Sequence, residues 1–227
     1  MTPTNYKTHY FVNLLLLILI ALLITPTAHA DINVKQFNKL YYAGQFDAAV
    51  AAFDKAIQSE DKNLNKETLI DMFESAFSQS KNPSSELLKQ KLLVAAKAKM
   101  LFFVKKRVRA TLKAVPLFDQ YKNANTTELH SALVELSKFN NKTLTYPHND
   151  YAKLRVMDMI LNQRRIQGKN EAGDHYLQAI IHDKISKSGD SQLKEYFKKA
   201  DKTDQFYQQA TKLKALYKDK YNIDIDK

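Results

Sequence analysis

Apolar residues recur every three to four positions along most of the chain, which is the spacing of amphipathic α-helices. Good helix formers fill these stretches, whereas glycine and proline are few. We therefore predict an all-α protein built from antiparallel helical hairpins. The helices are expected at residues 34–42, 47–58, 66–80, 85–115, 126–139, 150–167, 170–186, 191–200 and 203–221.

The longest predicted helix covers residues 85–115 and ends at Pro116, because proline cannot continue a helix. Its segments 92–96 and 100–104 are apolar on almost every side. A helix that is apolar all round belongs in the interior. We expect this one to be the central buried helix.

Residues 143–149 are the least helical stretch after the first 30 residues, and Pro147 lies within it. We predict a joint there, dividing one continuous domain into an N-terminal half, residues 31–146, and a C-terminal half, residues 147–227.

The first 30 residues carry the pattern of a secretory signal peptide. Lys7 precedes an apolar run from Phe11 to Ile24, and small residues lead up to Ala30. An uncleaved membrane anchor is the alternative, but a 14-residue helix spans about 21 Å, less than the ~30 Å hydrocarbon core. We expect cleavage after Ala30 and a periplasmic or secreted protein.

Cysteine is absent, which excludes disulfide and thiolate chemistry and fits a bacterial periplasmic protein. The formal net charge is +11, and residues 81–227 carry most of the positive charge. A basic exported protein is attracted to anionic membranes, cell-wall polymers or an acidic partner. The alternative is that the charge only keeps the protein soluble.

Residues 41–57 resemble the second half of a tetratricopeptide repeat. A turn glycine, two aromatic residues and two small residues occupy the matching places: Gly44, Phe46, Ala49, Phe53 and Ala56. Residues 168–180 repeat the pattern more weakly. The resemblance implies a helical array with a surface for a protein or peptide, and it carries no catalytic residue. An irregular helical bundle remains the alternative.

Four cations, Lys91, Lys105, Arg109 and Lys113, fall on one stripe of the predicted 85–115 helix. This stripe is the candidate partner-binding surface. The alternative is a solvated helix edge, with lysine stems lying over apolar neighbours.

Glu74 followed by Ser75 is similar to the Glu-Ser pair of lytic transglycosylases, which implies a cell-wall enzyme with Glu74 as general acid. That family's glycine-rich segment is missing, so we expect Glu74 to lie at the surface instead. Residues 171, 175, 178 and 182 form a polar stripe that a solvated helix face explains without a metal ion. We expect no enzyme activity, cofactor, metal or nucleic-acid partner.

The prediction for function is therefore an exported, non-enzymatic helical binding or scaffold protein that recognises a protein or peptide. The alternatives are a peptidoglycan-acting enzyme and a protein that binds anionic surfaces. The sequence does not indicate the oligomeric state.

Overall fold

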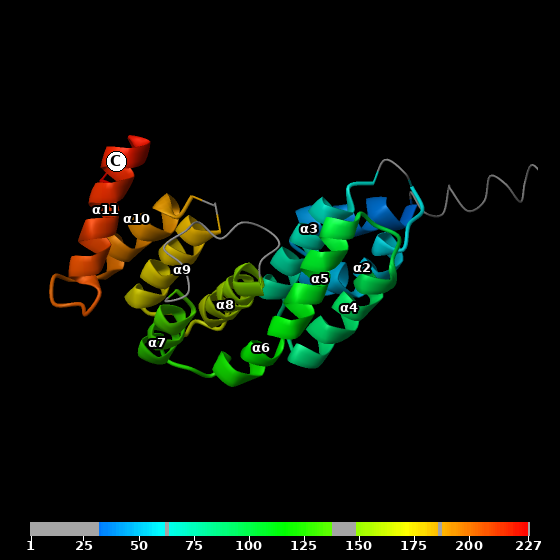
Figure 1. Cartoon of the computed structure of the whole chain (residues 1–227), viewed down its shortest axis with the longest axis horizontal. Helices are drawn as coiled ribbons and strands as arrows, with labels where there is room; N and C mark the ends of the chain where they lie inside the picture. Colours follow the sequence, from blue (N-terminus) through cyan, green and yellow to red (C-terminus); the bar gives the residue numbers. More distant parts are fainter. Residues whose placement is uncertain (1–31, 62–63, 138–148, 186–187, 227) are drawn as a thin grey trace, which may run out of the picture.

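The computed structural model describes residues 32–61, 64–137, 149–185 and 188–226, and every regular element in these ranges is a helix (Figure 1). The all-α prediction is confirmed. The predicted signal peptide and most of the predicted joint lie outside the described residues. After a first helix at residues 32–42, the helices are α2 Phe46–Ile57, α3 Lys66–Gln79, α4 Ser85–Lys97, α5 Phe102–Ala114, α6 Pro116–Tyr121, α7 Thr126–Ser137, α8 Asn149–Ile166, α9 Ala172–Lys184, α10 Asp190–Lys199 and α11 Tyr207–Tyr221.

The helix at residues 32–42 and α2 form the predicted hairpin, and Gly44 makes its turn with a left-handed φ of 69°. Phe53 is fully buried between Phe37, at a ring-centroid distance of 6.1 Å, and Phe73 of α3, at 4.2 Å. Ala49 and Ala56 are fully buried as well. The ring of Phe53 therefore joins the hairpin to α3, and the buried Ala49 and Ala56 lie on the same helix, α2.

The prediction of one helix over residues 85–115 is wrong. Ala98 and Leu101 have extended backbones, with ψ of 151° and 146°, and they separate α4 from α5. The turn lets α5 fold back against α4. Leu92 of α4 and Val108 of α5 are both fully buried. A single straight helix that is apolar on all sides would need packing partners on every side to bury both residues. Pro116 begins α6 at its first helical position, as a proline after a helix end should.

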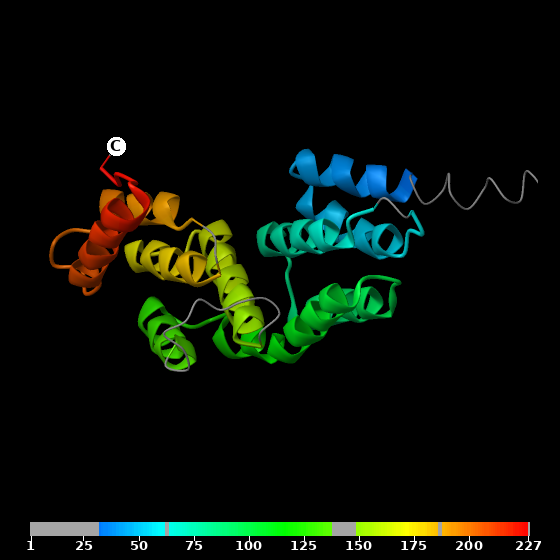
Figure 2. The ribbon, with the colours of Figure 1, turned by 45° about the horizontal axis from the view of Figure 1, so that its top comes forward.

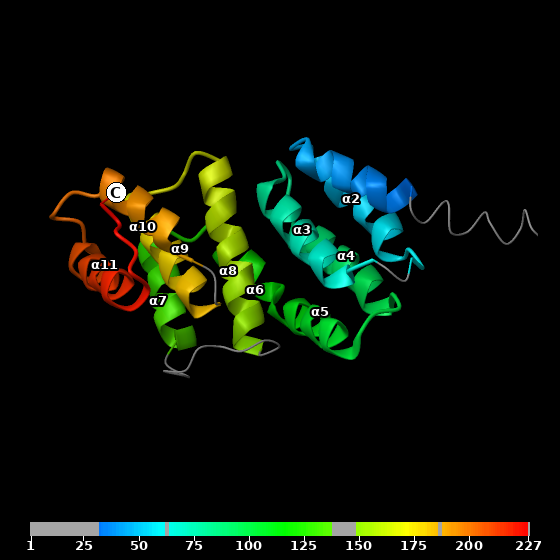
Figure 3. The ribbon, with the colours of Figure 1, turned by 90° about the horizontal axis from the view of Figure 1, so that it is seen from above.

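Helix α8 occupies the middle of the molecule (Figure 3). It packs against α3, α5 and α6 on one side and against α7 and α9 on the other. Its Gln163 donates from Nε2 to the carbonyl oxygen of Ser78 at 2.7 Å, at the end of α3. Helices from both sides of residue 146 are thus joined through α8, and α3 contacts a helix about 80 residues away in the sequence.

The C-terminal helices form a second layer, in which α9 packs on α10, and α11 lies against α10 (Figure 2). Tyr176 of α9 stacks on Phe206, with ring centroids 5.3 Å apart. The hydroxyl of Tyr217 on α11 accepts a hydrogen bond from the backbone N–H of Gly189 at 2.9 Å. Within the described residues, no helix has both the length and the apolar character needed to cross a membrane.

Candidate functional site

A buried cluster of charges joins α3, α5 and α8. Arg107 of α5 donates from Nη2 to Oε2 of Glu74 at 2.8 Å, and Arg155 of α8 donates from Nε to the same oxygen at 3.1 Å. Both guanidiniums also contact Asp71, one turn earlier on α3. The side chains of Glu74, Arg107 and Arg155 are almost completely buried. The carboxylates of Glu74 and Asp71 together balance the two guanidinium charges, which lessens the cost of removing them from water.

The two arginines of this cluster determine the protonation state of Glu74. Burial by itself raises the pKa of the Glu74 carboxyl, but the charges of Arg107 and Arg155 and their hydrogen bonds outweigh burial and lower the pKa to about 2. Burial also lowers the pKa of both guanidiniums, but the charge of Glu74, the hydrogen bonds to Glu74 and the contribution of Asp71 together outweigh burial and raise the pKa of each. Glu74 is therefore a carboxylate at neutral pH.

The prediction that Glu74 lies at the surface is wrong, because the residue is only 2% exposed. Its two arginine partners, Arg107 and Arg155, lie 33 and 81 positions further along the chain, so the local sequence around Glu74 does not indicate its burial. A general acid must carry a proton at the working pH, and a carboxyl with a lowered pKa does not. The geometry thus opposes the general-acid role.

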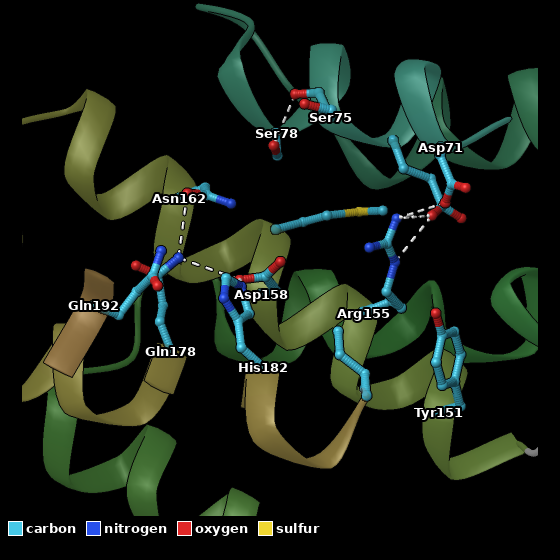
Figure 4. A pocket seen from close by; sticks show the side chains of 13 residues that line it. Asp71, Ser75, Ser78, Tyr151, Arg155, Asp158, Asn162, Gln178, His182 and Gln192 are labelled. Atoms are coloured by element: carbon cyan, nitrogen blue, oxygen red, sulfur yellow. Dashed lines mark hydrogen bonds and ion pairs between the residues drawn. The ribbon is translucent and has the colours of Figure 1, made fainter. Parts of the chain in front are cut away.

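A polar groove of about 380 Å³ adjoins this cluster between α3, α8, α9 and α10 (Figure 4). Side chains able to donate and accept hydrogen bonds line it from all four helices. They are Ser75 and Ser78 of α3, Tyr151, Asp158 and Asn162 of α8, Gln178 and His182 of α9 and Gln192 of α10, with Asp71, Glu74 and Arg155 at the charged end and Met159 and Ile185 as apolar lining.

Hydrogen bonds hold several of these side chains in place. Gln178 donates from Nε2 to Asp158 and to Asn162, each at 3.2 Å, and Nε2 of His182 lies 3.2 Å from Oδ1 of Asp158 (Figure 4). In contrast, Oε1 of Glu74 is buried without a hydrogen-bond partner. A buried carboxylate oxygen without a partner is stabilised when a bound molecule or a water molecule donates a hydrogen bond to it.

The polar stripe predicted on the helix near residue 175 is not a solvated face. His175 and Gln178 are 7% and 5% exposed, respectively. Burial and then the charge of Lys199, whose Nζ lies 2.8 Å from His175 Nε2, lower the pKa of this histidine. The described residues contain no group of three or more side chains suited to hold a metal ion.

The four cations of the predicted stripe do not share one helix. Lys91 belongs to α4, where it is buried and pairs with Oδ2 of Asp54 at 2.8 Å. Lys105, Arg109 and Lys113 follow one another at intervals of four residues on α5, where Arg109 and Lys113 are exposed. The premise of one continuous stripe is wrong because the chain turns between residues 97 and 102.

The same turn creates a feature that sequence reasoning missed. Leu101, Phe102 and Phe103 are 64%, 79% and 43% exposed. Leu101 and Phe103 also line an apolar groove of about 690 Å³, together with Leu64 and Met100. In one continuous buried helix, residues 101–103 would lie in the core. Their exposure follows from the break between α4 and α5, which the sequence did not predict.

Comparison of the chain with protein-family models, with curated proteins and with solved structures gives no match.

Proposed function

We propose that this protein is an exported, non-enzymatic helical binding or scaffold protein, and that it holds an extended segment of a protein partner in the polar groove. The observation that carries the proposal is the lining of that groove by amide, hydroxyl and carboxylate side chains from four helices. A volume of about 380 Å³ lies within the range of about 300–1,000 Å³ that is usual for ligand pockets.

The chemistry of the lining suits a peptide backbone. An extended peptide presents N–H donors and C=O acceptors that lose water when the peptide enters a groove, and each must find a new partner. Asn162 offers amide N–H donors, and Gln178 offers its side-chain oxygen, because its Nε2 already donates to Asp158 and Asn162. Ser75 and Ser78 offer hydroxyls. The unpartnered Oε1 of Glu74 offers an acceptor for a backbone N–H or a cationic side chain.

The groove is also prepared for binding before a partner arrives. The ion pairs of Arg155 and the hydrogen bonds of Gln178 hold its walls in a single arrangement. A prearranged site avoids the entropy cost of ordering side chains on binding. The resemblance of residues 41–57 to a tetratricopeptide repeat supports the same class of function, since such arrays present surfaces to peptides.

A photoreactive amino acid placed at position 162 in the full-length chain tests this proposal in the cells that make the protein. We expect it to form a crosslink with a protein partner, and we expect Gln178→Ala to weaken that crosslink. A reactive residue at the exposed Gln208 of α11 is the matched control. Crosslinks from position 162 no different from those at position 208 would contradict the proposal.

The alternative of a cell-wall enzyme makes a separate prediction. Purified protein would release soluble fragments from peptidoglycan, and Glu74→Gln would abolish the release without loss of the fold. Because the Glu74 carboxyl is ionised and tied to two arginines, we expect no release at any pH at which the protein stays folded.

A further inference from the structure

We propose that the turn between α4 and α5 inserts into the surface of an anionic lipid bilayer. Leu101, Phe102 and Phe103 would enter the boundary between head groups and acyl chains, and the surrounding lysines would contact the lipid phosphates. This surface is separate from the polar groove, and the inference does not rest on the proposed function.

The first observation is the concentration of exposed apolar side chains at the turn. The other large hydrophobic residues that the described chain exposes, such as Ile166 and Leu216, stand without a sequence neighbour of the same kind. Leu101, Phe102 and Phe103 are consecutive, and Phe102 is the most exposed of them at 79%. Isolated exposed residues of this kind are normal, whereas a contiguous group marks an interaction site.

The second observation is the charge around the turn. No acidic residue occurs between Glu86 and Asp119, and nine lysines and arginines lie in that interval. Two of them, Lys91 and Arg107, are buried in ion pairs. Among the rest, Lys97 and Lys99 stand directly before the apolar residues and are exposed. Apolar side chains beside lysines are the composition of interfacial membrane-binding surfaces.

The acids near the turn belong to the other side of the apolar groove. Glu60, Asp61 and Glu67 line it, together with Lys66 and Lys99. The exposed or half-exposed cations Lys97, Lys105, Lys106 and Arg109 add to those two lysines, so cations outnumber acids around the turn. This excess of positive charge around the turn favours binding to a bilayer rich in anionic lipid over binding to a neutral bilayer.

The third observation is the position of the turn in the fold. It lies at the same end of the molecule as the start of the helix at residues 32–42, and α11 lies at the opposite end (Figures 1 and 3). The polar groove is formed further along the molecule, by α3 together with α8, α9 and α10. A protein docked through the turn would therefore keep α8, α9 and α10 away from the membrane (Figure 3).

The chain contains no tryptophan, so a single Phe102→Trp substitution supplies a clean fluorescent reporter. With vesicles of phosphatidylglycerol, we expect a blue shift of its emission and quenching by brominated acyl chains. Leu216→Trp, at an exposed apolar site of α11, is the matched control and should show neither change. The same spectrum with and without vesicles at position 102, or equal shifts at both positions, would overturn the proposal.

Two sets of variants separate insertion from charge attraction alone. Leu101→Ser with Phe102→Ser should weaken vesicle binding about tenfold or more, while Leu216→Ser should not change it. Lys97→Gln with Lys99→Gln should weaken binding by about fivefold for each lysine, and binding should fall as salt rises. Lys212→Gln with Lys218→Gln on α11 is the control for the loss of two charges.

Circular dichroism establishes that each variant keeps the helical fold. Binding to phosphatidylcholine vesicles as tight as to phosphatidylglycerol vesicles would overturn the anionic-lipid proposal. Vesicle binding that is insensitive to both serine substitutions would overturn insertion. Capture of a protein partner that is lost with Phe102→Ser, in the absence of any vesicle binding, would assign the turn to a protein instead.

Discussion

Arg155 and Glu74 lie 81 positions apart in the sequence, yet Nε of Arg155 donates to Oε2 of Glu74 at 3.1 Å. Nη2 of Arg107 donates to the same oxygen at 2.8 Å. A single carboxylate oxygen therefore ties α3 to α5 and α8. Because α8 also packs on α7 and α9, this cluster fixes α3 and α5 to the helix that contacts the C-terminal helices.

Glu74→Gln should destabilise the protein by about 3–5 kcal/mol. The amide keeps the shape of the side chain but removes the buried one of the two carboxylate charges that balance Arg107 and Arg155. Glu67→Gln on the same helix is the control, since Glu67 is half-exposed and lies 3.8 Å from Arg107, so its loss should cost about 1 kcal/mol or less. Urea unfolding of the three proteins at neutral pH measures the difference. Equal losses in the two variants would contradict the account of the cluster.

The same carboxylate should make stability depend on acid. Its pKa is lowered in the folded protein to about 2, from an ordinary value of 4.5. The unfolded chain therefore takes up the proton first as pH falls. The stabilisation is fully present above about pH 4.5 and is lost as pH falls towards about 2, by up to about 3 kcal/mol.

Urea unfolding of the wild-type protein and Glu74→Gln at pH 6 and pH 3 tests this linkage. The variant cannot titrate at position 74, so the difference in stability between the two proteins should shrink at the lower pH. A difference that stays constant or grows would mean that another carboxyl dominates the acid response.

Local patterns in the sequence were sufficient to predict the helical class and most helix positions. The spacing of apolar residues predicted α2 and α3, Gly44 predicted the first turn, and Pro116 predicted the end of the helix before it, which is α5. Each of these features depends on residues within a few positions of one another. The burial of Glu74 could not be predicted this way, because its partners lie on α5 and α8.

The break between α4 and α5 escaped prediction for a related reason. Ala98, Lys99, Met100 and Leu101 include no glycine or proline, and their propensities favour a continuous helix. The gain from folding α5 back onto α4 and α8 outweighs this local preference. In the polar groove, Gln178 and His182 belong to the polar stripe that the sequence showed near residue 175. Their partner Asp158 lies on α8, so the sequence pattern of one helix could not show that these side chains meet.

Gly173→Ala should destabilise the packing of α9. A β-carbon at this position would lie 2.6 Å from Cε2 of Phe206 and 2.7 Å from Cγ2 of Thr126, which is closer than carbon atoms can pack. We expect a loss of about 1–3 kcal/mol by thermal unfolding. Adding Phe206→Leu should recover part of that loss, because the smaller side chain makes room. If the double variant loses as much stability as the two single variants together, the β-carbon at position 173 does not clash directly with the ring of Phe206.

Phe53→Ala should cost about 3–5 kcal/mol, because the ring is fully buried and its removal leaves a cavity between the first hairpin and α3. Tyr42→Ala is the control for loss of an aromatic ring, since Tyr42 is 78% exposed and its truncation should change stability little. Thermal unfolding compares the two. A melting temperature unchanged in Phe53→Ala would mean that the hairpin does not pack on α3 as described.

Ala49→Leu tests the other half of the packing pattern in segment 41–57, the need for small residues. Ala49 is fully buried on α2, so three additional carbon atoms must displace its neighbours, at a cost of about 1–3 kcal/mol. Ala48, the preceding residue on the same helix, is exposed, and Ala48→Leu should leave stability almost unchanged. Alanine and leucine have similar helix propensities, so the contrast between the two variants measures packing rather than helix formation. Equal melting temperatures would show that the core around α2 has room for a larger side chain, and the resemblance to close-packed repeat helices would then lose its physical basis.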